Sequence, residues 1–285
     1  MKSLLAPIQL AVVLLAPALF AQQTVTVADY VPPKDTSVLT TTYVEWNALV
    51  PQSTAVGELR PIFDNPTTTL DKLDFHATTL NPGKESHPPH RHPWEEMLLI
   101  KDGQFDVNIN GRSQRVGPGT LVFFASNDAH NAKNVGTTPA TYYVINFVSD
   151  LSHDAAAKPA AERAVPGKLA SGIYDPAKMT PKPTKAGHAL ELFESPTLTF
   201  QTLETHITTL NPGQISGPDT IDHNDELVVF QSGPVEIRVD GVAARLNAGS
   251  VLFWSPNVKR TLINIGTKPV TYEVFRVTTA RSPRQ

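Results

Sequence analysis

The chain has 285 residues, of which 40% are hydrophobic and 18% charged, and its net charge is −3. That balance fits a protein with a sizeable core and gives no basic surface for nucleic acid. The absence of cysteine excludes disulfides, thiolate nucleophiles and cysteine metal ligands. With 25 prolines and only 7% aromatic residues, the composition favours turn-rich β structure over a helical bundle.

Residues 1–21 have the pattern of a secretory signal peptide. Lys2 is followed by the apolar run "LLAPIQLAVVLLAPALFA", which has small residues near its end and is too short to span a bilayer well. We expect cleavage near Ala21 and a periplasmic or secreted mature chain with no membrane attachment. An uncleaved anchor is the alternative. Residues 22–38 then form a polar, proline-containing N-terminal arm.

The rest of the chain consists of two similar sequence repeats, offset from each other by 130 residues. "TTLNPG" occurs at 78–83 and 208–213, and "NVGTTPATYYV" at 134–144 corresponds to "NIGTKPVTYEV" at 264–274. The repeat predicts one domain over residues 39–150 and a second over 169–280. Residues 151–168 between them are rich in Ala, Lys and Pro, which predicts a linker with room for one short helix.

Each unit is predicted to consist of short strands. In the first unit, the alternating runs "FDVNIN" and "SQRV" are joined by Asn110-Gly111, and the second unit has Asp240-Gly241 at the same place. Both dipeptides are typical of two-residue β-hairpin turns. No convincing amphipathic helix lies within either unit, so the fold class is all-β.

Metal-ligating side chains gather in "SHPPHRHPWEEMLL", residues 86–99. Because alternate residues of a strand face the same side, His90, His92 and Glu96 are predicted to share one face with Trp94. The same face continues inward with Leu98 and Ile100. A further histidine, His130, follows a predicted buried strand and is the candidate fourth ligand.

These residues resemble the two motifs of the cupin superfamily. The first motif is matched by Gly83, the two histidines of "HRH", Glu96 and Gly103, with one extra residue between Gly83 and the first histidine. The second is matched by Gly111, Pro118-Gly119, His130 and Asn134. The resemblance implies tandem jelly-roll β-barrels, as in a bicupin similar to quercetin dioxygenase-like and germin-like proteins. It also implies four metal ligands: His90, His92, Glu96 and His130.

Nearby polar and aromatic residues have less definite roles. His87 lies in the approach loop, as a rim residue or as a proton shuttle of the pocket. Trp94 is a second pocket candidate, and like Phe124 it could instead be core. Glu95 has the opposite parity and is predicted to face outward. His76 and His206 share one strand position, which favours a structural hydrogen bond.

In the second unit, the ligand positions correspond to Thr220, Asp222, Glu226 and Arg260. We therefore expect a degenerate barrel in which an Arg–carboxylate cluster of Arg260, Asp222 and Glu226 replaces the metal. His223 has the wrong parity to join a metal site there. A second substrate site is the alternative to a barrel that only packs.

Three imidazoles and one carboxylate suit one divalent transition metal (Fe, Mn, Ni, Cu or Zn) with positions left for a substrate. By the resemblance, we expect a metal-dependent dioxygenase or oxidase acting on a small oxygen-rich molecule. The alternatives are a non-redox isomerase, lyase or hydrolase and a non-catalytic binding or storage bicupin. Met97 and Leu99 are apolar at outward parity, so that face is buried either between the two barrels or in a homodimer.

Overall fold

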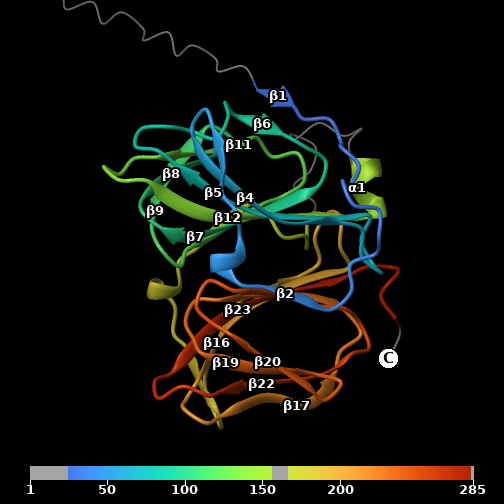
Figure 1. Ribbon diagram of the computed structural model, residues 1–285. Helices are drawn as coiled ribbons and strands as arrows, with labels where there is room; N and C mark the ends of the chain where they lie inside the picture. Colours follow the sequence, from blue (N-terminus) through green and yellow to red (C-terminus); the bar gives the residue numbers. More distant parts are fainter. Residues whose placement is uncertain (1–24, 156–165, 284–285) are drawn as a thin grey trace, which may run out of the picture.

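The computed structural model describes residues 25–155 and 166–283, and it folds into two β-barrels, one above the other in Figure 1. The predicted signal peptide, residues 1–21, lies outside the described residues, and its cleavage stays a prediction. Within the described ranges, no helix has the length and apolar character needed to cross a bilayer.

The first barrel is built from two sheets. The smaller contains, in order of pairing, β1 (Thr26–Val27), β6 (His90–Arg91), β11 (His130–Asn134), β8 (Phe105–Ile109) and β9 (Arg112–Val116). The larger contains β13 (Gly172–Tyr174), β10 (Leu121–Phe124), β7 (Glu95–Asp102), β12 (Ala140–Val148), β5 (Lys72–Leu80), β4 (Gly57–Asn65) and β3 (Gln52–Thr54).

The second barrel repeats this plan. Its smaller sheet contains β17 (Ile215–Ile221), β22 (Lys259–Asn264), β19 (Val235–Val239) and β20 (Val242–Leu246). Its larger sheet contains β14 (Lys182–Thr184), β15 (Gly187–Ser195), β16 (Thr202–Leu210), β23 (Val270–Thr278), β18 (Asp225–Phe230), β21 (Val251–Trp254) and β2 (Thr42–Val44). The described helices are α1 (Asp150–Ala155) and two short 3-10 turns, Trp46–Ala48 and Pro176–Lys178.

The predicted hairpin turns are confirmed. Asn110 and Gly111 have φ of 50° and 83°, and Asp240 and Gly241 have 46° and 87°. Two successive left-handed residues define the turn whose twist matches that of the flanking strands, and Asn-Gly and Asp-Gly adopt it at least cost. The turns fix the register of β8 with β9 and of β19 with β20.

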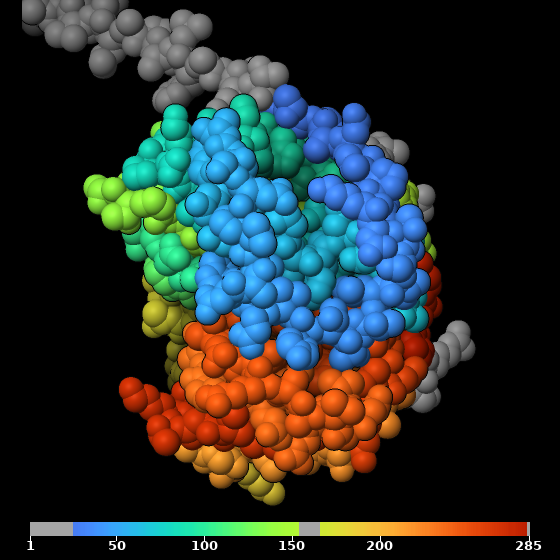
Figure 2. Space-filling model, viewed as in Figure 1, coloured from blue at the N-terminus to red at the C-terminus, as the bar shows by residue number. Residues whose placement is uncertain are grey.

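Strand β7 is buried on both faces, because each face belongs to a different core. Leu98 and Ile100 pack inside the first barrel. Met97 and Leu99 pack in a second core that both barrels share, with residues such as Val229 of the second barrel. The two barrels of one chain therefore bury this face. Figure 2 shows the blue-green and orange-red halves touching along their boundary. A homodimer through other surfaces stays a prediction.

The first short strand of each repeat pairs with the other barrel. Residues 42–44 form β2 at the edge of the second barrel, where Tyr43 lies opposite Leu252. Residues 172–174 form β13 at the edge of the first barrel, where Ile173 lies opposite Val122. The repeat assigned each segment to the domain that follows it in sequence. In space, each segment completes the sheet of the other domain and ties the barrels together.

Glu95 points out of the first barrel, as predicted, but solvent does not reach it. Its side chain is buried against the second barrel, where the Leu198 backbone N–H donates to Oε1 at 3.1 Å. Burial raises the pKa of Glu95 to about 7. The second barrel makes the reciprocal contact, because Asp225 accepts hydrogen bonds from Thr67 and, at 2.6 Å, from Thr69. Each barrel thus buries one carboxylate, Glu95 or Asp225, against the other barrel.

Candidate metal centre

Three histidines meet at one end of the first barrel. His90 and His130 lie opposite each other on the paired strands β6 and β11, and His92 follows two residues after His90. Candidate ligand nitrogens of the three imidazoles all lie within 4.8 Å of one another. Glu96, at the start of β7, completes the group: its Oε2 is 3.3 Å from His92 Nε2, and its Oε1 is 3.5 Å from His130 Nε2. The four residues predicted as ligands are therefore brought together.

Backbone carbonyls orient two of these rings. The Nδ1 of His92 lies 3.0 Å from the Trp94 carbonyl oxygen, and the Nδ1 of His130 lies 2.8 Å from that of Asp128. Since a carbonyl oxygen can only accept, each Nδ1–H is the donor. The Nε2 of a neutral ring then keeps its lone pair for a ligand, which is how metal-binding histidines are commonly held.

The centre is rich in acceptors and poor in donors. Burial lowers the pKa of His92 and lowers that of His90 to about 3, so both rings are neutral at pH 7. Burial alone would raise the pKa of Glu96, but the neighbouring His130 and His92 hold it well below its usual value. His90 Nδ1 and His130 Nε2 are buried without a hydrogen-bond partner. Lone pairs that face a buried carboxylate are a poor arrangement unless a cation lies between them, so the group can bind a divalent transition metal.

Aromatic rings stack on two of the imidazoles. The Phe124 ring stacks on His130, with centroids 4.1 Å apart and planes 12° from parallel. Trp94 stacks on His92 in the same way, and its indole Nε1–H donates to Asn146 Oδ1 at 3.0 Å. Trp94, a candidate pocket residue, therefore lies behind a ligand.

A cavity of about 320 Å³ opens beside the centre. His130 and Glu96 line one end, and His87 lines it too, with its ring centroid 3.8 Å from that of His90. Elsewhere the wall is mixed, with apolar side chains and the hydroxyls of Thr78, Ser86 and Tyr142. The position of His87 is therefore compatible with both predicted roles, as a rim residue or as a proton shuttle.

The wall includes residues that the sequence alone did not indicate. Tyr142, Val144 and Asn146 of β12 face the cavity together. Their equal parity could have identified them once His130 and Glu96 had fixed the inner face. Comparison of the two repeats was a second clue. Tyr142 corresponds to a tyrosine, Tyr272, whereas Asn146 corresponds to Arg276.

Two further histidines, His76 and His206, have the partners of structural residues. His76 Nδ1 lies 3.0 Å from Asp74, and His206 Nδ1 lies 2.8 Å from Glu204, so the hydrogen-bonded role predicted for this strand position is present in both barrels. His223 is half-buried and contacts Asn257 at 2.6 Å.

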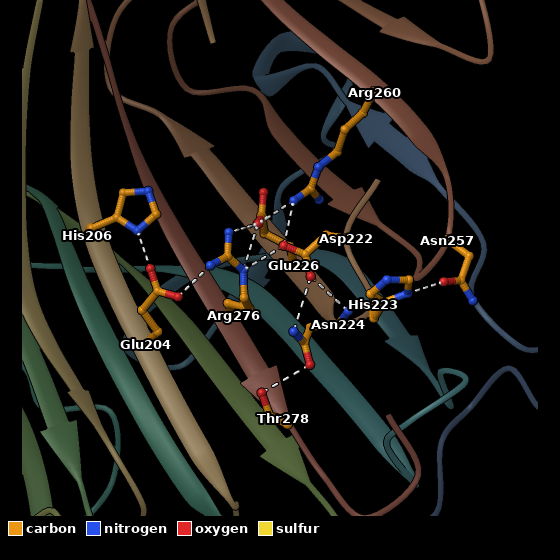
Figure 3. Close-up of polar contacts among 10 residues, drawn as sticks. All are labelled: Glu204, His206, Asp222, His223, Asn224, Glu226, Asn257, Arg260, Arg276 and Thr278. Atoms are coloured by element: carbon orange, nitrogen blue, oxygen red, sulfur yellow. Dashed lines mark hydrogen bonds and ion pairs between the residues drawn. The ribbon is translucent and has the colours of Figure 1, made fainter. Parts of the chain in front are cut away.

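The second barrel holds a cluster of ion pairs at the place of the metal centre, and Figure 3 shows its members pointing toward one another. One Nη of Arg260 contacts Asp222 at 3.2 Å and Glu226 at 2.8 Å, which agrees with the expected cluster. A second arginine, Arg276 of β23, also contacts both carboxylates, at 3.2 and 2.9 Å, and reaches Glu204. Thr220 lines the cavity beside the cluster.

The guanidinium groups of this cluster replace the positive charge of a metal ion, and the cluster leaves a smaller cavity than that of the first barrel. The two guanidinium groups face three carboxylates (Asp222, Glu226 and Glu204), so the acceptors are already satisfied by fixed cations. The cavity beside them is about 160 Å³, against about 320 Å³ in the first barrel. Trp254 lies under Arg260, 5.7 Å from ring centroid to guanidinium, where Phe124 lies under His130 in the first barrel.

Comparison with known proteins agrees with the two barrels. The profile of the cupin domain matches residues 77–146 and again 206–275. No curated protein sequence gave a significant match.

Solved structures match the described architecture over most of the chain. A formate complex of Lactobacillus farciminis oxalate decarboxylase has a TM-score of 0.63 at 16% identity, covering 88% of this chain and 90% of that one. A deletion mutant of Bacillus subtilis oxalate decarboxylase gives 0.62 at 17% identity, with 87% and 80% covered. AerE from Microcystis aeruginosa gives 0.60 at 13% identity, with 80% and 97% covered. The repeated profile match and the shared two-barrel architecture show that this chain belongs to the cupin family and is a two-domain cupin protein.

Proposed function

We propose that this chain is an exported, metal-dependent enzyme of the oxygenase or oxidase type, acting on a small oxygen-rich molecule in the cavity of the first barrel. One observation carries the proposal. The nitrogens of three histidines converge beside a buried carboxylate, two of the ring nitrogens have no hydrogen-bond partner, and a cavity opens directly beside them. A purely structural histidine cluster would have its polar atoms paired, as His76 and His206 do.

His90, His92, Glu96 and His130 would hold the ion. A redox-active divalent metal there would supply electron transfer and polarise an oxygen of the substrate. The chain's own groups would position that substrate. Tyr142, Ser86 and Thr78 place hydroxyl groups on the cavity wall, where they would hydrogen-bond with substrate oxygens. Apolar side chains such as Leu98 and Phe124 line the same space and exclude water from it.

Export is part of the proposal and is supported by the N-terminal sequence, with its positive Lys2 and its apolar run up to Ala21. N-terminal sequencing of the protein recovered from the periplasm or medium tests it. A mature chain that starts near Gln22 is expected, and recovery of the intact leader in the cytoplasm would contradict it.

The test of the activity starts with metal content, measured by inductively coupled plasma mass spectrometry on untagged protein purified without added metal. About one Fe, Mn, Ni or Cu per chain is expected, followed by oxygen uptake with diketone and flavonol substrates. One Zn per chain without oxygen uptake would favour the non-redox isomerase, lyase or hydrolase. No metal, even after reconstitution, would leave a binding protein.

A second candidate is decarboxylation of oxalate, the activity named for the Lactobacillus farciminis and Bacillus subtilis proteins. Its support is the shared two-barrel shape. Formate and carbon dioxide released from oxalate without net oxygen uptake would favour it over an oxygenase.

A further inference from the structure

We infer that the cavity of the first barrel selects a singly charged ligand with two oxygen donors and an apolar body, such as a hydroxyketone, a diketone enolate or a catechol. It disfavours a dianion such as a dicarboxylate. This inference rests on the proposed function, because it takes the metal to be bound, and it specifies the class of substrate.

The lining of the cavity provides little positive charge to balance a dianion. Among the described residues that line the cavity there is no lysine or arginine. The carboxylates in the lining are Glu96, which belongs to the metal centre, and Glu58, which pairs with Arg60 at 2.9 Å. A divalent ion with three neutral imidazoles and Glu96 has one net positive charge. One negative charge on the ligand balances it, whereas a second would find no lysine or arginine in the wall, and the carboxylate of Glu58 lies on the same lining.

The second barrel shows that an arginine fits at the equivalent place. Arg276 and Arg260 both line its cavity. The first barrel has Asn146 in place of Arg276, and the oxygen of that amide already accepts a hydrogen bond from Trp94. The fold therefore permits a cation at this position of the wall, and the first barrel has a neutral group there instead.

The shape and polarity of the cavity wall favour a ligand with an apolar body. Val56, Leu59, Leu98, Phe124 and Val144 form an apolar surface, and the hydroxyls of Ser86 and Tyr142 lie on the same lining. The volume, about 320 Å³, is at the lower end of small-molecule sites, which run from about 300 to 1,000 Å³. A ring or short chain would fill such a space and bury apolar surface. A two-carbon dicarboxylate would leave the apolar wall uncovered.

Oxalate and oxamate test the charge preference, because they have nearly the same shape and donor atoms and differ by one charge. We would load the purified protein with Co(II), confirm one ion per chain, and titrate each ligand by visible absorption and by calorimetry. Relative to aqueous Co(II), the loaded protein should shift the oxamate-to-oxalate affinity ratio toward oxamate by about tenfold.

A ratio equal to that of the free ion, or shifted toward oxalate, would overturn the inferred class while leaving the metal site intact. Failure to load Co(II) would instead overturn the proposed function and the inference with it. The metal determination made before the titration distinguishes the two failures.

Two substitutions locate the effect in the wall. Glu58→Gln should strengthen oxalate binding about threefold, with a smaller change for oxamate, because one negative charge leaves the lining. Glu236→Gln is the matched control: Glu236 pairs with the arginine two residues on, as Glu58 does, but it lies in the second barrel. Equal effects of the two substitutions would mean that the charge of the wall does not select the ligand.

The apolar half of the inference has its own probe. Maltol is a singly charged hydroxyketone chelator with a ring, and Leu59→Ser should weaken maltol binding about threefold or more while leaving oxamate unchanged, since only maltol reaches the apolar wall. Equal loss for both ligands would show a general disturbance of the site and would remove the evidence for an apolar substrate body.

Discussion

The indole of Trp94 lies flat against the imidazole of His92, with ring centroids 4.2 Å apart and planes 3° from parallel. The indole is itself fixed by its hydrogen bond to Asn146. The stack limits the rotation of a ligand whose Nδ1 is already held by a backbone carbonyl. Trp94 therefore positions His92 before any metal arrives.

Trp94→Leu should weaken metal binding about tenfold while leaving the stoichiometry at one ion, because removal of a supporting contact around a ligand typically costs ten- to hundredfold in affinity. Trp94→Phe keeps a flat ring and should lose less. Affinity is measured by competition with a chelator. The control is Trp46→Leu, at a tryptophan that packs between the barrels. Unchanged metal affinity in Trp94→Leu would mean that the backbone contact alone fixes the orientation of the His92 ring.

His92→Ala should abolish stoichiometric metal binding and leave both barrels folded. The second barrel folds with Asp222 at the same position and with no histidine at its other ligand positions, so the ligands are not needed for the fold. Metal content and circular dichroism check the two halves of this prediction. His76→Ala serves as the control, because His76 pairs with Asp74 and should keep one ion per chain. Normal metal content in His92→Ala would show that the ligand set is wrong.

Loss of Arg260 alone should cost less than loss of both arginines. Arg276 contacts the same two carboxylates, so Arg260→Ala leaves Asp222 and Glu226 with a partner and should cost about 1–2 kcal/mol of unfolding free energy. Arg260→Ala with Arg276→Ala leaves the buried Glu226 without a cation and should cost about 3–5 kcal/mol.

Urea unfolding measures both variants of the cluster. Addition of Asp222→Asn and Glu226→Gln to the double variant should restore part of the loss, because the uncompensated charges are then gone. A double variant as stable as the single one would mean that the cluster contributes little to stability.

The contribution of Glu95 and Glu273 to stability should fall as the pH rises from about 4.5 to 8. Burial raises the pKa of Glu95 to about 7 and that of Glu273 to about 8, from a usual value of 4.5. Glu273 accepts one hydrogen bond from Gln231, and its Oε1 is buried without a partner in the described structure. The folded chain therefore holds protons that the unfolded chain releases, so their contribution is complete below pH 4.5 and is lost through pH 7 and 8.

The loss should be on the order of 3 kcal/mol for Glu95 and 5 kcal/mol for Glu273. Urea unfolding at pH 5 and pH 9 measures it, with Glu95→Gln and Glu273→Gln each expected to flatten the profile. Glu236→Gln, at a carboxylate paired with Arg238 in the second barrel, should leave the profile as it is. A difference in stability between the wild type and either glutamine variant that stays constant from pH 5 to pH 9 would contradict the raised pKa values.

Local pattern was enough to predict the parts of the site that lie within one strand or turn. Strand alternation placed His92 and Glu96 on one face, and the Asn110-Gly111 turn set a hairpin register, because side-chain direction along a strand and backbone strain in a turn depend on neighbouring residues alone. The repeat at an offset of 130 residues then gave the second barrel and the loss of its ligands.

Contacts between distant strands were beyond such a pattern. Arg276 joins Glu226 across 50 positions, and β12 brings Asn146 to the metal centre from 50 positions beyond Glu96. Neither separation follows from a local period. Only the pairing of β23 with β18, and of β12 with β7, brings these side chains onto one inner face.

The sequence by itself determined the all-β class, the two units, the hairpin turns and the four candidate ligands, because these follow from alternation, turn residues and an internal repeat. The tertiary structure decided that β2 and β13 each complete the other barrel. It also decided that Glu95, at outward parity, is buried against Leu198. The physical reason is that parity fixes which way a side chain points, whereas the partner packed against that face depends on which apolar surfaces meet when the two barrels pack together.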